Sequence, residues 1–169
     1  LFRSADHKEI EQNYGKAVQA MYPIKGKRTR HYAFYDELDI KQLSEDRLME
    51  DVFEDALKNG EFQLWYQPKV DPVTGNILGA EALIRWKRPD GTMLSPGKFI
   101  PLFEKNGNIT TLDEYVFRTV CAQQQRWLQA GAKLYPISVN ISRVSLYYSN
   151  VVDKYWELLN SFQLDPTYV

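Results

Sequence analysis

Two strand-like runs on either side of a dense turn signal constrain the fold of this chain more than any other feature. Phe62 to Val70 and Ile77 to Trp86 are rich in aromatic and branched apolar residues, the composition typical of β-strands. Between them, Asp71–Asn76 combines Asp, Pro, Gly and Asn, which favour tight turns. We therefore predict a β-hairpin.

Helical and strand-like segments alternate after this hairpin. Ser95-Pro96 opens a short helix, because proline is well tolerated in a first helical turn. A longer helix runs from about Thr111 to Ala130, where Thr111 and Glu114 form a capping-box pattern. Its predicted inner face consists of Leu112, Val116, Val120 and Trp127, and Gly131 ends it. A strand over Leu134–Ile141 and a helix over Val151–Phe162 follow, and this order predicts a layered α/β structure or a barrel.

The residues before the hairpin divide into two segments. A helix from about Ser4 to Met21 is followed by a basic loop over Lys25–Arg30 and a short strand over Tyr32–Tyr35. The acidic stretch Asp36–Gly60 also has helical periodicity, with Ile40, Leu43, Val52 and Ala56 on one stripe. Its carboxylates indicate either a solvated helix face or a linker helix between two domains. We place boundaries at 1–36, 37–60 and 61–169.

Composition excludes several classes of protein. The chain of 169 residues carries 21 Lys and Arg against 22 Asp and Glu, which argues against a general nucleic-acid binder. It contains one cysteine, so an internal disulfide is excluded and a reducing compartment is favoured. No apolar run approaches the ~18 residues of a membrane span. We expect Cys121 to be a buried structural residue, and His7 and His31 lack the spacing of metal ligands.

The run Gly79–Trp86 places polar side chains inside an apolar strand. Glu81, Leu83 and Arg85 alternate, so all three point to one face. One interpretation is an ion pair between Glu81 and Arg85 or a contact at the rim of the sheet. The other is a functional face, because active-site groups of α/β barrels gather at the carboxyl ends of strands.

A second polar pair follows the strand predicted at Leu134–Ile141. Asn140 and Ser142 share one face, which is consistent with simple turn chemistry at a strand end. Glu81 and Asn140 are both hard oxygen donors, and on neighbouring strand ends they could hold Mg²⁺ or Mn²⁺. Arg85 could bind a phosphate with two parallel hydrogen bonds. Together these groups point to phosphate chemistry.

From Glu61 onward the chain resembles an EAL domain, the family that hydrolyses the bacterial second messenger cyclic di-GMP. The residues that carry the likeness are, in order, Tyr66-Gln67-Pro68; Gly79–Trp86 with Glu81-Ala82-Leu83 inside it; Ser95-Pro96 with Phe99-Ile100-Pro101; Glu104 with Gly107; and Ser138–Ser142. Five short motifs with ordered spacing make this resemblance specific.

The resemblance implies a fold and a site. The family fold is a (β/α)₈ TIM-like barrel whose first strand is antiparallel to the others, which agrees with the hairpin. By resemblance, Glu81 is a catalytic metal ligand and Asn140 a second ligand, while Arg85 contacts a phosphate. Gln67, Leu83 and the segment from Phe99 to Pro101 line the dinucleotide pocket. The reaction is metal-assisted hydrolysis of cyclic di-GMP to linear pGpG, with two Mg²⁺ or Mn²⁺ ions.

The N-terminal segment resembles the end of a GGDEF domain, the cyclase family that commonly precedes EAL domains. This likeness rests on Asn13–Met21, the Lys25-Gly26 loop and His31–Asp36, while the GGDEF motif itself is absent. Residues 1–36 are therefore expected to be a GGDEF-like remnant, 37–60 a linker helix and 61–169 the first part of an EAL domain. Expected partners are cyclic di-GMP, a second copy in a homodimer, and an upstream GGDEF or sensory domain. We expect a cytoplasmic location, although upstream segments could still anchor the full-length protein in a membrane.

The length conflicts with a complete barrel. A closed (β/α)₈ barrel typically needs ~250 residues, so residues 61–169 amount to an incomplete one, and the remaining metal ligands of the family lie beyond Val169. We expect a truncated chain, a partner that completes the barrel, or a longer protein. The 169-residue chain alone is expected to be inactive. The alternative function is an inactive EAL domain that acts as a cyclic di-GMP receptor or an interaction module.

Overall fold

The computed structural model describes residues 7–21, 37–147 and 150–169, and the chain divides into two units, 1–50 and 51–169. The first unit contributes α1, His7–Met21, and nearly all of α2, Glu37–Asp51. The helix predicted from about Ser4 to Met21 is thus confirmed from His7 onward. Its predicted start, the basic loop and the strand predicted at Tyr32–Tyr35 lie outside the described residues. No helix in the described part of the chain is long and apolar enough to cross a membrane.

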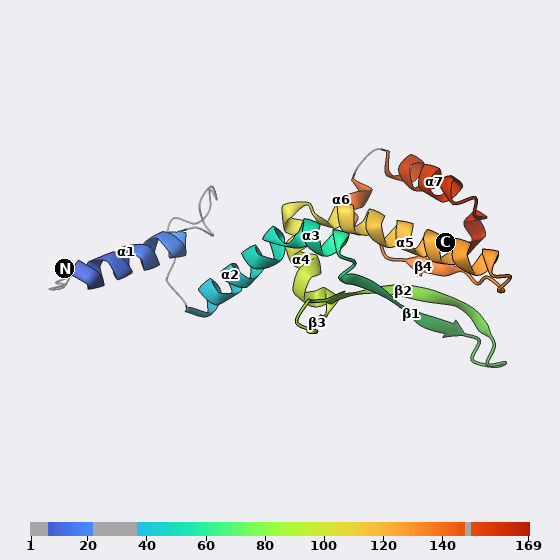
Figure 1. The fold of residues 1–169 in the computed structure, drawn as a ribbon, viewed down its shortest axis with the longest axis horizontal. Coiled ribbons are helices and arrows are strands. Elements are labelled where there is room, and N and C mark those ends of the chain that lie inside the picture. Colours follow the sequence, from blue (N-terminus) through green and yellow to red (C-terminus); the bar gives the residue numbers. More distant parts are fainter. Residues whose placement is uncertain (1–6, 22–36, 148–149) are drawn as a thin grey trace. The chain divides into compact units, whose positions relative to one another are not determined.

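The second unit is built on a small mixed sheet (Figure 1). Its strands are β1, Phe62–Val70; β2, Ile77–Lys87; β3, Met93–Leu94; and β4, Ile137–Val139. β1 is antiparallel to β2, and β4 is parallel to β2. The predicted hairpin and its antiparallel first strand are therefore confirmed. The sheet is open, as expected of an incomplete EAL-type barrel.

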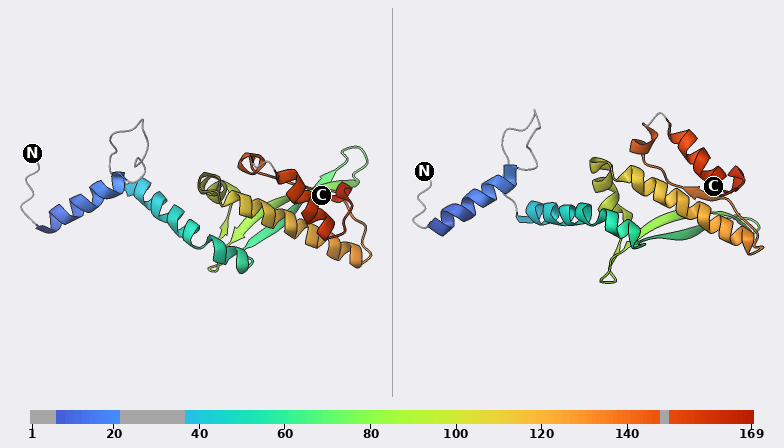
Figure 2. Two further views of the ribbon diagram at one scale, coloured as in Figure 1. Left: turned by 90° about the horizontal axis from the view of Figure 1, so that it is seen from above. Right: turned by 45° about the horizontal axis from the view of Figure 1, so that its top comes forward.

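The helices of this unit are α3, Phe53–Lys58; α4, Pro96–Asn106; α5, Ile109–Gln129; α6, Arg143–Leu146; α7, Val151–Ser161; and the 3₁₀ helix η2, Pro166–Tyr168. Two of them, α4 and α5, connect β3 to β4, whereas α3 precedes β1 and the remaining helices follow β4. Figures 1 and 2 show α5 lying along the sheet, with α7 on its far side. Val120 of α5 packs on Ala82 and Ile137 of the sheet, whereas Phe117 and Cys121 pack on α7.

An aromatic cluster joins α3, the hairpin and α4. Phe62 lies 4.7 Å from Trp86 and 5.8 Å from Phe99 between ring centroids, and Phe53 lies 4.7 Å from Phe103. All five side chains are essentially inaccessible to solvent, and burying each contributes about 1.5–3 kcal/mol of hydrophobic free energy. This cluster holds the carboxyl end of β2, the strand that carries Glu81 and Arg85.

Three local predictions differ from the structure. The helix expected over Asp36–Gly60 is two helices separated at Val52, because Phe53 turns into the aromatic cluster. α5 begins at Ile109, which belongs to the core, and its N-cap Asn108 makes no side-chain capping bond. The predicted capping box is therefore wrong. The strand expected over Leu134–Ile141 is limited to β4, Ile137–Val139, because only these three residues pair with β2.

Candidate functional site

Strand register gathers the polar residues of the sheet on one face. Gln67 of β1 lies opposite Glu81 of β2, and Ser138 of β4 lies opposite Glu81 on the other side. Because side chains alternate along a strand, the same face carries Gln63, Trp65, Gln67 and Lys69 from β1, and Glu81, Leu83 and Arg85 from β2. These side chains are exposed or half-buried, whereas the opposite face packs against α4 and α5. We call this polar surface the open face.

Glu81 and Asn140 meet on the open face. The Asn140 side-chain amide donates a hydrogen bond of 2.7 Å from Nδ2 to Oε1 of Glu81. Asn140 directly follows β4, so the parallel pairing of β2 with β4 brings together residues that are 59 positions apart. The two oxygen donors proposed from sequence therefore lie side by side.

Arg85 does not pair with Glu81. Its Nη1 donates a hydrogen bond of 2.8 Å to the carbonyl oxygen of Ile84, and the described residues show no salt bridge between Glu81 and Arg85. The interpretation of the strand pattern as an internal ion pair is therefore wrong. The guanidinium remains on the open face, towards the carboxyl end of β2.

The expected pocket-lining residues fall into two groups. Gln67 and Leu83 lie on the open face near Glu81, in positions suited to ligand contact. Phe99 is 0% exposed and belongs to the aromatic cluster, so its side chain supports the fold and is not available to a ligand. Pro101 is exposed within α4.

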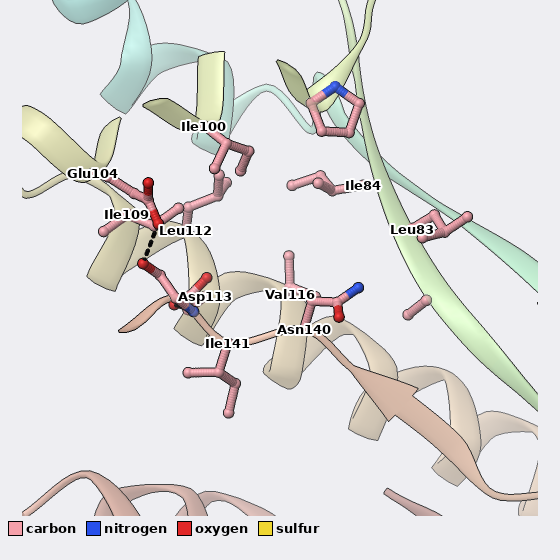
Figure 3. A pocket seen from close by; sticks show the side chains of 13 residues that line it. Leu83, Ile84, Ile100, Glu104, Ile109, Leu112, Asp113, Val116, Asn140 and Ile141 are labelled. Atoms are coloured by element: carbon pink, nitrogen blue, oxygen red, sulfur yellow. Dashed lines mark hydrogen bonds between the residues drawn. The ribbon is translucent and has the colours of Figure 1, made fainter. Parts of the chain in front are cut away.

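A cavity of about 260 Å³ lies between β2, α4, α5 and the segment after β4. Figure 3 shows Glu104 and Asp113 among its apolar walls, with Asn140 nearby. Asp113 is 5% exposed, and this burial raises the pKa of its carboxyl group, while hydrogen bonds from Ser145 and Ser142 act in the opposite direction.

The arrangement of Glu81 and Asn140 fits part of a site for a hard divalent cation. A half-turn of the Asn140 side-chain amide exchanges the positions of Nδ2 and Oδ1. The amide oxygen then lies beside Glu81. Carboxylate and amide oxygens are ligands that Mg²⁺ and Mn²⁺ accept. Within the described residues, however, no three His, Cys, Asp or Glu side chains gather as a metal cluster. This pair can therefore supply only some of the ligands.

The family model for the EAL domain matches residues 50–168. This match covers well over half of the chain. The chain belongs to the EAL family.

Curated relatives and solved structures are consistent with this membership. The EAL chain is 32% identical over 154 residues to the bifunctional diguanylate cyclase/cyclic di-GMP phosphodiesterase MucR of Pseudomonas aeruginosa, covering 90% of this chain and 22% of the relative. It is 34% identical over 113 residues to the probable cyclic di-GMP phosphodiesterase PdeB of Escherichia coli, covering 67% of this chain and 22% of the relative. The chain thus spans about a fifth of the length of these curated relatives.

Two solved structures have a similar fold. The structure of PaMucR phosphodiesterase in complex with c-di-GMP matches with a TM-score of 0.66 and 34% identity, covering 72% of this chain and 49% of that one. The S helix-GGDEF-EAL part of LapD from Vibrio cholerae, without ligand, matches with a TM-score of 0.59 and 18% identity. It covers 95% of this chain and 37% of that one, and at this identity it supports the fold alone.

Sequence reasoning missed two groups near the site. Lys69 lies on the open face and donates a hydrogen bond of 2.7 Å to Oγ of Ser138. Its position could have been predicted, because Lys69 follows Gln67 by two residues in β1 and therefore points to the same face. Asp113 was missed because it lies between apolar residues of α5 and has no motif of its own. A carboxylate inside an apolar helix stripe is the signal that could have drawn attention to it.

Proposed function

We propose that the full-length product of the gene that encodes this chain hydrolyses cyclic di-GMP to linear pGpG. The observation that carries this proposal is the 2.7 Å contact between Glu81 and Asn140 on the open face of an EAL-family sheet. A carboxylate and an amide at adjacent strand ends, with Arg85 towards the rim, suit a phosphodiester that binds with divalent cations.

The residues of this chain have separate roles in the proposed reaction. Glu81 and Asn140 contribute oxygen ligands to a two-metal Mg²⁺ or Mn²⁺ site whose remaining ligands lie beyond Val169. When bound, such ions supply a water activated for attack and offset the charge on the phosphate. Arg85 exchanges its bond to the Ile84 carbonyl for a ligand phosphate. Gln67 and Leu83 orient the dinucleotide on the same face.

We also propose the domain organisation that follows from the sequence. Residues 1–36 form the end of a GGDEF-like domain, 37–60 a linker helix and 61–169 the first part of the EAL domain. A homodimer, an upstream GGDEF or sensory domain and a cytoplasmic location belong to the same proposal. Limited proteolysis of the full-length gene product tests the proposed boundaries, since cleavage within the linker helix over 37–60 should leave 61–147 intact.

Replacing the candidate metal ligand tests the proposed reaction. In the full-length gene product with Mg²⁺ or Mn²⁺, we expect Glu81→Ala to reduce conversion of cyclic di-GMP to pGpG by at least about 100-fold, because even residues around metal ligands contribute 10–100-fold. Products are separated by liquid chromatography. The matched control is Glu157→Ala, which removes an exposed carboxylate on α7 and should leave turnover unchanged.

The same measurements separate an enzyme from a receptor. If the unaltered protein binds cyclic di-GMP in calorimetry but releases no pGpG, the receptor function replaces the proposed one. If it hydrolyses the nucleotide and Glu81→Ala turns over normally, the assignment of the site is wrong. Absence of both binding and hydrolysis refutes the proposed function altogether.

A further inference from the structure

We propose that Asp113 is a positioning residue that holds the segment after β4 so that the Asn140 amide stays beside Glu81. Asp113 lies on α5, on the helix-covered side of the sheet, and its side chain binds Ser142 and Ser145 and not Asn140 or Glu81. What Asn140 and Glu81 do with a metal rests on the proposed function. How Asp113 places Asn140 rests on its hydrogen bonds to Ser142 and Ser145.

One carboxylate oxygen of Asp113 binds the start of α6 twice. Oδ2 accepts a hydrogen bond of 2.8 Å from the backbone N–H of Ser142 and one of 2.7 Å from the hydroxyl of Ser145. Asp113 and Ser145 are both buried, at 5% and 3% exposed. Hydrogen bonds to an ionised carboxylate are about twice as strong as neutral ones, so this contact is a firm attachment between α5 and the segment after β4.

Glu104 of α4 provides a second attachment at the same place. The Ser142 hydroxyl donates a hydrogen bond of 2.6 Å to Oε1 of Glu104, drawn as a dashed line in Figure 3. The same hydroxyl oxygen accepts a bond of 3.2 Å from the backbone N–H of Val144, which caps α6. Ser142 is therefore held through its main chain by α5 and through its side chain by α4.

Asn140 lies between two fixed points. Val139 pairs with Ala82 in the sheet, and Ser142 is fixed by Asp113, so only Asn140 and Ile141 separate the ladder from the attachment. A segment this short has little freedom, and the exposed Asn140 side chain is directed to Glu81 by its backbone. Functional groups need this kind of support, because a displacement of about 1 Å is enough to weaken a binding site.

Removing the Asp113 carboxylate leaves the Ser142 N–H and the Ser145 hydroxyl without their acceptor in a buried place. Such groups are costly to leave unpaired, so the start of α6 is expected to move towards water. Asn140 would move with it, and Glu81 would lose its neighbour while β2 stays in place.

The experiment compares four variants of the full-length gene product. Asp113→Ala removes the acceptor, Asp113→Asn keeps an acceptor oxygen of the same size, and Ser145→Ala removes one of the two bonds. The matched control is Gln124→Ala, on the same helix. Gln124 is also fully buried and binds the carbonyl oxygens of Tyr135 and Tyr168, but lies about 16 Å further along α5 at 1.5 Å per residue.

Binding of Mn²⁺ alone, measured by calorimetry, is the first readout, and amide hydrogen exchange of the peptide covering 140–146 is the second. We expect Asp113→Ala to raise the dissociation constant for Mn²⁺ by about 10–100-fold, as for other residues that orient ligands, and to speed exchange at 140–146. Asp113→Asn and Ser145→Ala should give smaller effects, with the asparagine variant closest to the unaltered protein. Gln124→Ala should lower thermal stability without changing either readout.

The outcomes separate this inference from the proposed function. Unchanged exchange at 140–146 in Asp113→Ala, or equal effects from Gln124→Ala, would overturn the positioning role, because the loss would then be general destabilisation. If Asp113→Ala does not fold, Asp113→Asn and Ser145→Ala decide the question by the same readouts. If the unaltered protein neither binds Mn²⁺ nor hydrolyses cyclic di-GMP, the proposed function fails, and faster exchange confined to 140–146 still supports the positioning role.

Discussion

Replacing Gly79 by alanine tests how closely β2 packs against the segment that leads into β4. A Cβ atom added at Gly79 would lie 2.6 Å from the carbonyl oxygen of Pro136. That oxygen accepts a hydrogen bond of 2.9 Å from the backbone N–H of Ala80, so it belongs to the pairing that brings Asn140 to Glu81. The close contact is between backbones, and no side-chain rotation can relieve it.

The expected cost follows from these distances. Real Cβ atoms essentially never approach closer than 3.0 Å, so the two segments must separate by at least the difference from 2.6 Å. Overpacking of a rigid contact costs about 1–3 kcal/mol, and weakening the Ala80–Pro136 hydrogen bond costs about 0.5–1.5 kcal/mol. We expect Gly79→Ala to lower the free energy of unfolding by about 2–4 kcal/mol.

Urea unfolding of the full-length gene product measures this loss, with intrinsic tryptophan fluorescence, to which the buried Trp86 contributes, as the signal. Amide hydrogen exchange of the peptide covering 77–84 locates it. The matched control is Gly97→Ala in α4, where an added Cβ meets nothing within 4 Å. Because alanine is a better helix former than glycine, this control should be neutral or stabilising by up to about 1 kcal/mol.

Equal stability of Gly79→Ala and Gly97→Ala would refute the reasoning. So would a loss in Gly79→Ala without faster exchange at 77–84, since the cost would then arise elsewhere. A reduced affinity for Mn²⁺ in Gly79→Ala is also expected, because Glu81 and Asn140 lie on the two strands that the substitution separates.

Two further predictions concern α5. Burial raises the pKa of the Cys121 thiol to about 11, so native protein at pH 8 should react with Ellman's reagent only as it unfolds, and rapid labelling without unfolding would contradict the buried position. The bond from Lys154, followed by that from Arg118, holds the pKa of Glu114 below its usual value. The stability that this pairing contributes is present above the pKa of Glu114 in the unfolded state and is lost as pH falls through its pKa in the folded state. Glu114→Gln should therefore lower stability at pH 7 by no more than about 1 kcal/mol and match the unaltered protein in acid, as followed by thermal unfolding; a constant difference at all pH values would exclude this account.

Local patterns predicted the elements of the second unit well because each carried its own physical signal. The hairpin strands were predicted nearly to their ends, since turn residues at Asp71–Asn76 separate two β-favouring runs. Helix α7 was predicted to within a residue because its apolar positions repeat at helical spacing. The break at Val52 was missed because it depends on the packing of Phe53 in the aromatic cluster, and the start of α5 was missed because it depends on the burial of Ile109 in the core.

The candidate site was partly predictable for the same reason. Alternation put Glu81 and Arg85 on one face, and the strand-end position of Asn140 suggested a polar role. The partners of these residues were not predictable. That Asn140 binds Glu81 and that Phe99 is buried are consequences of packing between segments far apart in the chain. The bond of Arg85 to the carbonyl oxygen of the adjacent Ile84 is local, but it depends on a side-chain conformation that residue type does not determine.

The sequence alone determined the family, the hairpin, the alternation of helices and strands, and the face on which Glu81 points, because these depend on residue type and short-range spacing. Only the tertiary structure decided that β4 lies parallel beside β2 and that Asp113, buried on the other side of the sheet, fixes the turn next to Asn140. A hydrogen bond between residues 29 positions apart has no local periodicity. It exists because α5 crosses behind the strands and brings a buried carboxylate to the start of α6.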